Sequence, residues 1–67
     1  MNKNEFKAVI AKNGETQTQL AAAMGLNPSG ISDRLNGKIP FRQNEIAFIR
    51  DRYHLSAKEV DRIFFAA

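Results

Sequence analysis

Apolar residues recur at helical spacing along almost the whole chain, and glycine or asparagine interrupts the pattern at short intervals. Separations of three and four residues place side chains on one face of an α-helix, whereas a half-buried strand needs strict alternation. Phe6, Val9 and Ile10 form the first such stripe, which predicts a helix over residues 2–13. Asn13-Gly14 then ends it, because glycine readily takes the left-handed conformation that follows a helix.

Two shorter helices are predicted between residues 16 and 38. Thr16 can cap a helix over residues 17–24, and Gly25 stands where that helix must stop. Asn27 is a good cap and Pro28 a good first residue for the next helix, which continues to Asn36-Gly37. The inward-facing positions of the two helices are apolar: Leu20, Ala21, Met24, Ile31 and Leu35.

The last third of the chain predicts two more helices. One covers residues 43–53 and carries an apolar face, with His54 as a left-handed C-terminal residue. The other opens at Ser56, where Glu59 completes a capping box. Between these helices and the first three, Ile39 and Phe41 are predicted to hold a loop against the core. The fold class is therefore all-α, a compact five-helix bundle in a single domain over residues 1–67.

Two helices joined by a short corner with glycine form a helix-turn-helix, whose second helix can lie in the major groove of DNA. This stretch resembles the helix-turn-helix of phage repressor and Cro-type transcriptional regulators. The similarity is carried by Gln17, Leu20-Ala21, Met24-Gly25-Leu26, Ile31 and Asn36-Gly37-Lys38, and further on by Phe41, Glu45-Ile46, Ile49, Leu55-Ser56 and Glu59-Val60. The resemblance implies a lambda repressor-like DNA-binding domain that acts as a prophage repressor or Cro-type regulator in the cytoplasm of a bacterial host.

The chain departs from that family at two positions. The family usually has an apolar residue where Arg34 stands, and it often has a polar base-reading side chain where Pro28 stands. Small or hydrogen-bonding side chains are expected to face outward on the second helix of the motif and to meet base edges. The candidate base contacts are Pro28, Ser29, Ser32, Asp33 and Arg34.

Phosphate contacts are expected beside that helix, because cations and amides next to a groove-entering helix bind the sugar-phosphate backbone. Lys38 and Arg42 lie in the loop that follows it. The resemblance adds Thr16, Gln17 and Asn36 at the ends of the two helices. The predicted partner is double-stranded operator DNA.

Three phenylalanines exceed what a small core needs. Phe48 lies off the apolar face of its helix, and Phe64 and Phe65 are neighbours about 100° apart, so both cannot face one core. Phe48, Phe64 and Phe65 are therefore candidate dimer contacts. A weak homodimer, which could form only on DNA, would place two half-sites about 34 Å apart on an imperfect palindrome.

Composition narrows the function classes. The 67 residues include no cysteine and one histidine, so no metal site or cofactor is predicted, and no nucleophile and base have catalytic spacing. No long apolar run or leader indicates a membrane segment. A net charge of +3 favours a polyanionic partner only weakly. A sequence-specific DNA-binding regulator is the leading hypothesis, an enzyme with a small-molecule substrate is disfavoured, and a protein-interaction module such as an antitoxin or repressor antagonist stays open.

Overall fold

Four of the five helices begin at a residue whose side chain accepts a hydrogen bond from the third residue beyond it. The computed structural model describes residues 1–65. These form α1 (Lys3–Lys12), α2 (Gln17–Ala23), α3 (Pro28–Leu35), α4 (Gln43–Tyr53) and α5 (Ala57–Val60), with a π-helical turn over Asp61–Phe65. No strand occurs in residues 1–65. The predicted all-α, five-helix fold class is confirmed.

The four capped starts follow one geometry. Oδ1 of Asn2 and of Asn27 accepts from the backbone N–H of the third residue at 3.1 and 2.8 Å. The hydroxyls of Thr16 and Ser56 do the same at 3.1 and 3.2 Å, and each is part of a reciprocal capping box. Such caps satisfy amides that the first turn of a helix leaves unpaired. They explain why the helix starts could be predicted from a few neighbouring residues.

Left-handed residues end the helices where the sequence predicted them. Gly25 has φ +73° and turns the chain between α2 and α3. His54 has φ +53° and ψ +46° at the end of α4, as expected for its C-terminal residue. In this conformation a non-glycine residue is strained, so the surrounding structure must hold His54 in place.

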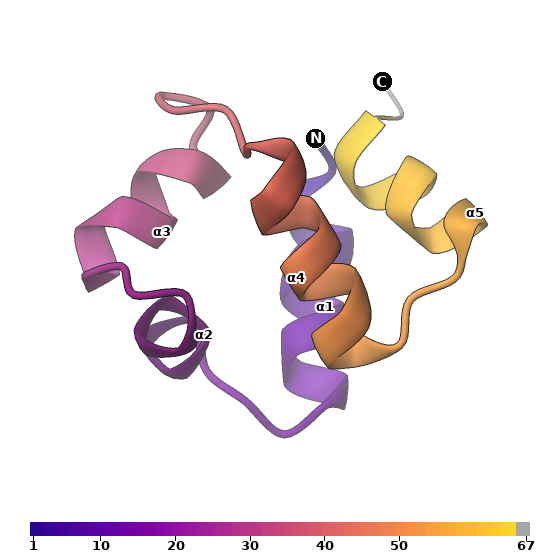
Figure 1. Ribbon diagram of the computed structural model, residues 1–67, viewed down its shortest axis with the longest axis horizontal. Coiled ribbons are helices and arrows are strands. Elements are labelled where there is room, and N and C mark those ends of the chain that lie inside the picture. The colour runs from indigo at the N-terminus through magenta and orange to yellow at the C-terminus, as the bar shows by residue number, and fades with distance from the viewer. Residues whose placement is uncertain (66–67) are drawn as a thin grey trace.

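The largest fully buried side chains come from α1, α2, α3, α4 and the final π-helical turn. These are Phe6, Leu20, Ile31, Ile49 and Ile63. Figure 1 shows α1 and α4 in the middle, α2 and α3 on one side, and α5 on the other. The N–H of Asn2 donates to the carbonyl of Ile63 at 2.7 Å, which joins the start of the chain to its final turn. No helix in residues 1–65 is long and apolar enough to cross a membrane.

Three aromatic rings cluster next to that core. Phe41 stacks on Phe6 with ring centroids 5.5 Å apart, and Phe64 meets both rings edge to face at 5.3 and 5.7 Å. Phe41 therefore holds the α3–α4 loop against the bundle, as predicted. Phe64 is part of this cluster and is half-buried, and its role as a dimer contact stays a prediction.

The same loop turns Ile39 outward. The N–H groups of Lys38 and Ile39 both donate to the carbonyl of Asp33, at 2.9 and 3.3 Å, which folds the loop back onto the end of α3. The Ile39 side chain remains 39% exposed, so the prediction that it is buried is wrong.

Candidate nucleic-acid interface

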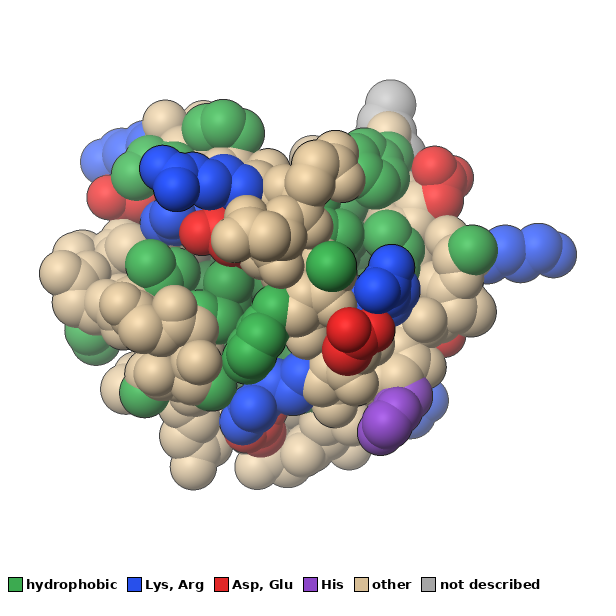
Figure 2. Space-filling view, viewed as in Figure 1, with side chains coloured by type: hydrophobic (Ala, Val, Ile, Leu, Met, Phe, Trp, Pro, Cys, Tyr) green, Lys and Arg blue, Asp and Glu red, His purple; other side chains and the backbone are tan. Residues whose placement is uncertain are grey.

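The outer face of α3 is short, polar and open to solvent. Pro28, Ser29 and Ser32 are exposed and Asp33 is half-buried, while Ile31 and Leu35 face the core. Figure 2 shows mainly backbone and side chains that are neither charged nor apolar over α2 and α3, with cationic side chains over the end of α3 and the loop beyond it. Four of the five predicted base-contacting residues therefore lie on an accessible surface.

The turn before α3 fixes how far the helix projects. Gly25 reverses the chain, and the N–H of Leu26 donates to the carbonyl of Ala21 at 2.8 Å. Leu26 packs against the core, and Asn27 caps the helix that starts at the next residue. α3 packs against α2, so the two helices and the turn between them form one unit.

The two serine hydroxyls have local partners that a ligand can replace. Ser29 Oγ donates to Asn27 Oδ1 at 2.8 Å, and Asn36 Nδ2 donates to Ser32 Oγ at 3.3 Å. All four side chains are exposed, so these bonds compete with water and add little to stability. The hydroxyls can therefore donate to or accept from base edges.

Cations surround the end of α3. Lys38 and Arg42 are exposed and form no ion pair within residues 1–65. Lys3 Nζ donates to Asn36 Oδ1 at 3.2 Å, which brings a third cation from the start of α1 to the same place. No local sequence pattern predicts this position of Lys3, because its partner Asn36 is 33 residues away.

The start of α2 carries two of the predicted phosphate contacts, Thr16 and Gln17. The Thr16 hydroxyl accepts the capping bond from Gln19, and Gln17 is half-buried at the first position of the helix. Thr16 is therefore confirmed as a cap. The phosphate contacts of Thr16, Gln17 and Asn36 stay predictions.

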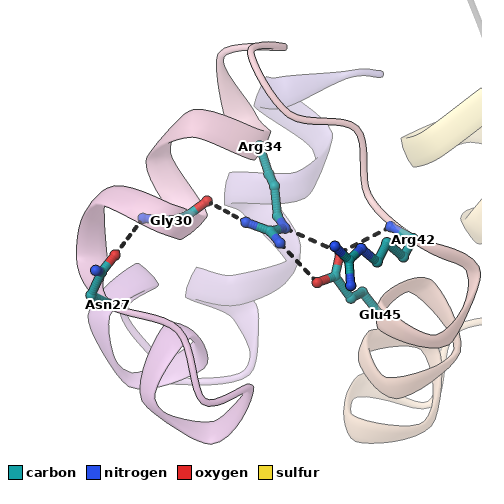
Figure 3. A network of polar contacts seen from close by, with 5 residues as sticks. All are labelled: Asn27, Gly30, Arg34, Arg42 and Glu45. Carbon is teal, nitrogen blue, oxygen red and sulfur yellow. Dashed lines mark hydrogen bonds and ion pairs between the residues drawn. The ribbon is translucent and has the colours of Figure 1, made fainter.

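Arg34 is not on the outer face, and its prediction as a base contact is wrong. It is only 8% exposed, because Ile31, Arg34 and Leu35 occupy one face of α3 at i, i+3 and i+4. Its guanidinium binds Glu45 through two parallel hydrogen bonds, from Nε to Oε1 at 3.1 Å and from Nη2 to Oε2 at 3.0 Å. Nη1 donates to the carbonyl of Gly30 at 3.0 Å (Figure 3).

The Glu45 carboxylate closes this network. Its Oε1 also accepts from the N–H of Arg42 at 2.9 Å, at the start of α4, where Arg42 itself provides no side-chain cap. Burial raises the pKa of Glu45, but the hydrogen bonds from the Arg34 side chain and the Arg42 backbone outweigh it and hold the pKa below 4.5. Glu45 is therefore ionised at neutral pH although its side chain is only 13% exposed.

A second two-bond ion pair lies elsewhere in the bundle. Arg52 on α4 donates to Glu15 before α2, with Nε to Oε1 at 2.8 Å, and this pair was not predicted from the sequence. Hydrogen bonds from Arg52 lower the pKa of Glu15 to about 2. Burial, followed by the Glu15 carboxylate, raises the pKa of Tyr53 to about 12.

The remaining candidate dimer contacts are exposed but lie in different places. Phe65 is 57% exposed and lines an open hollow of about 330 Å³ together with Met1 and Ile39. Phe48 is 38% exposed beside Met24, away from that hollow. Residues 1–65 contain no group of three or more side chains that could hold a metal ion.

Comparison with known proteins gives a family but no function. Residues 4–67 match the model of a family described as "Protein of unknown function (DUF739)". No curated protein and no solved structure is significantly similar to the chain. The function must therefore be inferred from the surface described above.

Proposed function

We propose that this chain, which belongs to the DUF739 family, is a sequence-specific DNA-binding regulator of the repressor or Cro type. The description of the family assigns it no function. The observation that carries the proposal is the exposed polar face of α3, a capped helix that no other part of residues 1–65 covers. The major groove is about 12 Å wide and admits one α-helix. α3 would enter it with Ser29 and Ser32 toward the base edges.

The chemistry of that face suits base recognition. The serine hydroxyls can bond to either a donor or an acceptor, and the half-buried Asp33 can accept from a cytosine amino group. Pro28 offers an apolar contact to a thymine methyl group. Each good contact discriminates against the wrong base by about 1–3 kcal/mol.

The cations around the end of α3 would hold the phosphate backbone. Lys3, Lys38 and Arg42 are exposed, and each neutralised phosphate steepens the dependence of affinity on salt. Phosphate contacts set the register of a protein on DNA, whereas base contacts set the sequence. The two groups of residues should therefore give separable effects.

A homodimer completes the proposal. Two copies related by a twofold axis would read the two halves of an imperfect palindrome, and the hollow lined by Met1, Ile39 and Phe65 borders the α3–α4 loop and would be the contact surface. Because this surface is small, we propose that the dimer is weak and forms on DNA. Sedimentation of the protein with a palindromic duplex should show two copies bound, and one copy at saturation would refute the dimer.

The test is a selection of bound duplexes from a random pool, followed by fluorescence anisotropy at several salt concentrations. We expect one preferred sequence, bound more tightly than a scrambled duplex, with affinity for both falling as salt rises. Lys58→Ala is the control, because Lys58 is an exposed cation on α5, on the other side of the bundle (Figure 1). Absent or salt-insensitive binding would contradict the proposal and favour a protein-interaction module such as an antitoxin or repressor antagonist.

A further inference from the structure

Arg34 and Glu45 connect α3 to α4 directly behind the exposed face of α3. Arg34 lies two residues after Ser32, and two residues along a helix are about 200° apart, so the two side chains point in opposite directions. Ser32 is exposed and Arg34 is buried, as this geometry requires. Any rotation of α3 about its axis would move both groups together.

The bonds made by Arg34 constrain that rotation. Its planar guanidinium is held by the carbonyl of Gly30 on its own helix and by both oxygens of Glu45 on the next. Glu45 is held in turn by the N–H of Arg42 at the start of α4. A guanidinium and a carboxylate joined by two parallel bonds fit in one orientation, whereas apolar side chains in contact can slide over one another.

Gly30 lies between the cap of α3 and the Arg34 guanidinium. A Cβ at Gly30 would lie 3.3 Å from Oδ1 of Asn27, the capping atom, and 3.7 Å from Nη1 of Arg34. The cap of α3 and the buried cation therefore meet across the same small residue. The beginning of α3, its inward face and the start of α4 form one polar network (Figure 3).

We propose that the Arg34–Glu45 pair sets the rotation of α3, and that it determines which bases the exposed side chains meet without itself touching DNA. This inference rests on the proposed function. Arg34 and Glu45 are thus positioning residues. The surface of a helix lies about 5–6 Å from its axis, so a rotation of about 10° moves a side-chain tip by about 1 Å. Such a shift is enough to break a base contact, because binding groups must be held within about 0.5 Å.

A buried ion pair is suited to this role. Charges taken out of water seldom add net stability compared with well-packed apolar residues of similar size. An apolar pair at this position could therefore hold the bundle together equally well. What it would lack is the directional bonding that fixes one rotation of α3.

The test replaces both partners with apolar residues, in Arg34→Met with Glu45→Leu. The matched control is Glu15→Leu with Arg52→Met, which removes a two-bond pair that does not touch α3. The measured quantity is the ratio of affinities for the selected duplex and a scrambled duplex, under conditions where both variants are folded by circular dichroism. We expect this ratio to fall about tenfold or more in the first variant and to stay within about twofold in the control. Affinity for the scrambled duplex and its salt dependence should stay unchanged in both.

A second measurement tests the same idea without DNA. Residual dipolar couplings of the backbone amides report the orientation of α3 relative to α4 in the free protein. The Arg34→Met, Glu45→Leu variant should show a rotated or averaged α3, and the control should match the unaltered protein. An unchanged α3 orientation, or an unchanged affinity ratio, would overturn the positioning role. Failure of the unaltered protein to select any sequence would instead overturn the proposed function, while the couplings would still decide whether the pair fixes α3.

Discussion

Removing Arg34 alone should destabilise the protein strongly, and the structure gives the reason. In Arg34→Met, the Glu45 carboxylate would stay largely buried and keep only the bond from the N–H of Arg42. Breaking a buried ion pair by removing one partner costs about 3–5 kcal/mol. We expect about 3 kcal/mol, because Glu45 is not fully buried and can take up a proton. A domain of this length is stable by about 3–10 kcal/mol, so the loss is large.

The effect should depend on pH with a distinctive sign. In the unaltered protein the pKa of Glu45 lies below 4.5, so its contribution is complete above that pH and disappears as the pH falls further. Without Arg34, burial should raise the pKa of Glu45 above 4.5. The free energy of unfolding of Arg34→Met should then rise as the pH falls from 7 to 5, where that of the unaltered protein stays level.

Urea denaturation followed by circular dichroism measures both effects. The control is Arg34→Met combined with Glu45→Leu, which removes the uncompensated charge and should restore stability to within about 1 kcal/mol of the unaltered protein. A loss below about 1 kcal/mol in Arg34→Met would refute the argument. So would an equal loss in the double variant, because the cost would then come from packing and not from the charge.

Three further predictions concern the exposed face of α3, the turn before it and the loss of stability at acid pH. Ser32→Ala should change which sequences are selected. Lys38→Ala should weaken binding to all duplexes and reduce the slope of log affinity against log salt concentration by about one. The opposite pattern in anisotropy titrations would mean that α3 is rotated relative to the proposed orientation. Gly25→Ala should lower the free energy of unfolding by about 1–2 kcal/mol, because alanine is strained at φ +73°. No neighbouring atom lies within 4 Å of the added Cβ, so backbone strain is the whole cost. An unchanged midpoint in urea denaturation would contradict this. Glu15→Gln should remove part of the acid sensitivity, because the pKa of Glu15 is lowered to about 2 and the stability it supplies above pH 4.5 is lost between those values; denaturation curves with the same acid dependence as the unaltered protein would exclude that contribution.

The local signals in the sequence were sufficient for the helices and turns. The caps at Thr16, Asn27 and Ser56 and the stop at Gly25 depend on residues no more than four positions apart. Such interactions form within one helical turn, so a single sequence contains all that is needed to find them. Met24 shows the remaining imprecision, since it was predicted inside the second helix and is its C-terminal cap.

The polar contacts between helices were not predictable in the same way. Arg34 pairs with Glu45 over 11 residues and Arg52 with Glu15 over 37, and each pairing depends on how whole helices pack. The burial of Arg34 did leave a signal. It continues the spacing of Ile31 and Leu35 on the inward face, but its charge led to the interpretation that it points outward. Knowledge of a buried acidic partner would have been required to read that position correctly.

The net charge of the chain does not describe the charge of the surface near α3. Four of the ten cations form ion pairs within residues 1–65, and all four are arginines: Arg34, Arg50, Arg52 and Arg62. The two pairs with two parallel bonds fix α4 to α3 and to the segment before α2. Lys38 and Arg42 remain unpaired beside α3, and Lys3 joins them through Asn36. Two of the seven acidic residues, Glu15 and Glu45, are held in these two pairs, while exposed cations lie near the helix that we propose enters DNA. A polyanion approaching α3 would meet a more positive surface than the net charge of +3 indicates.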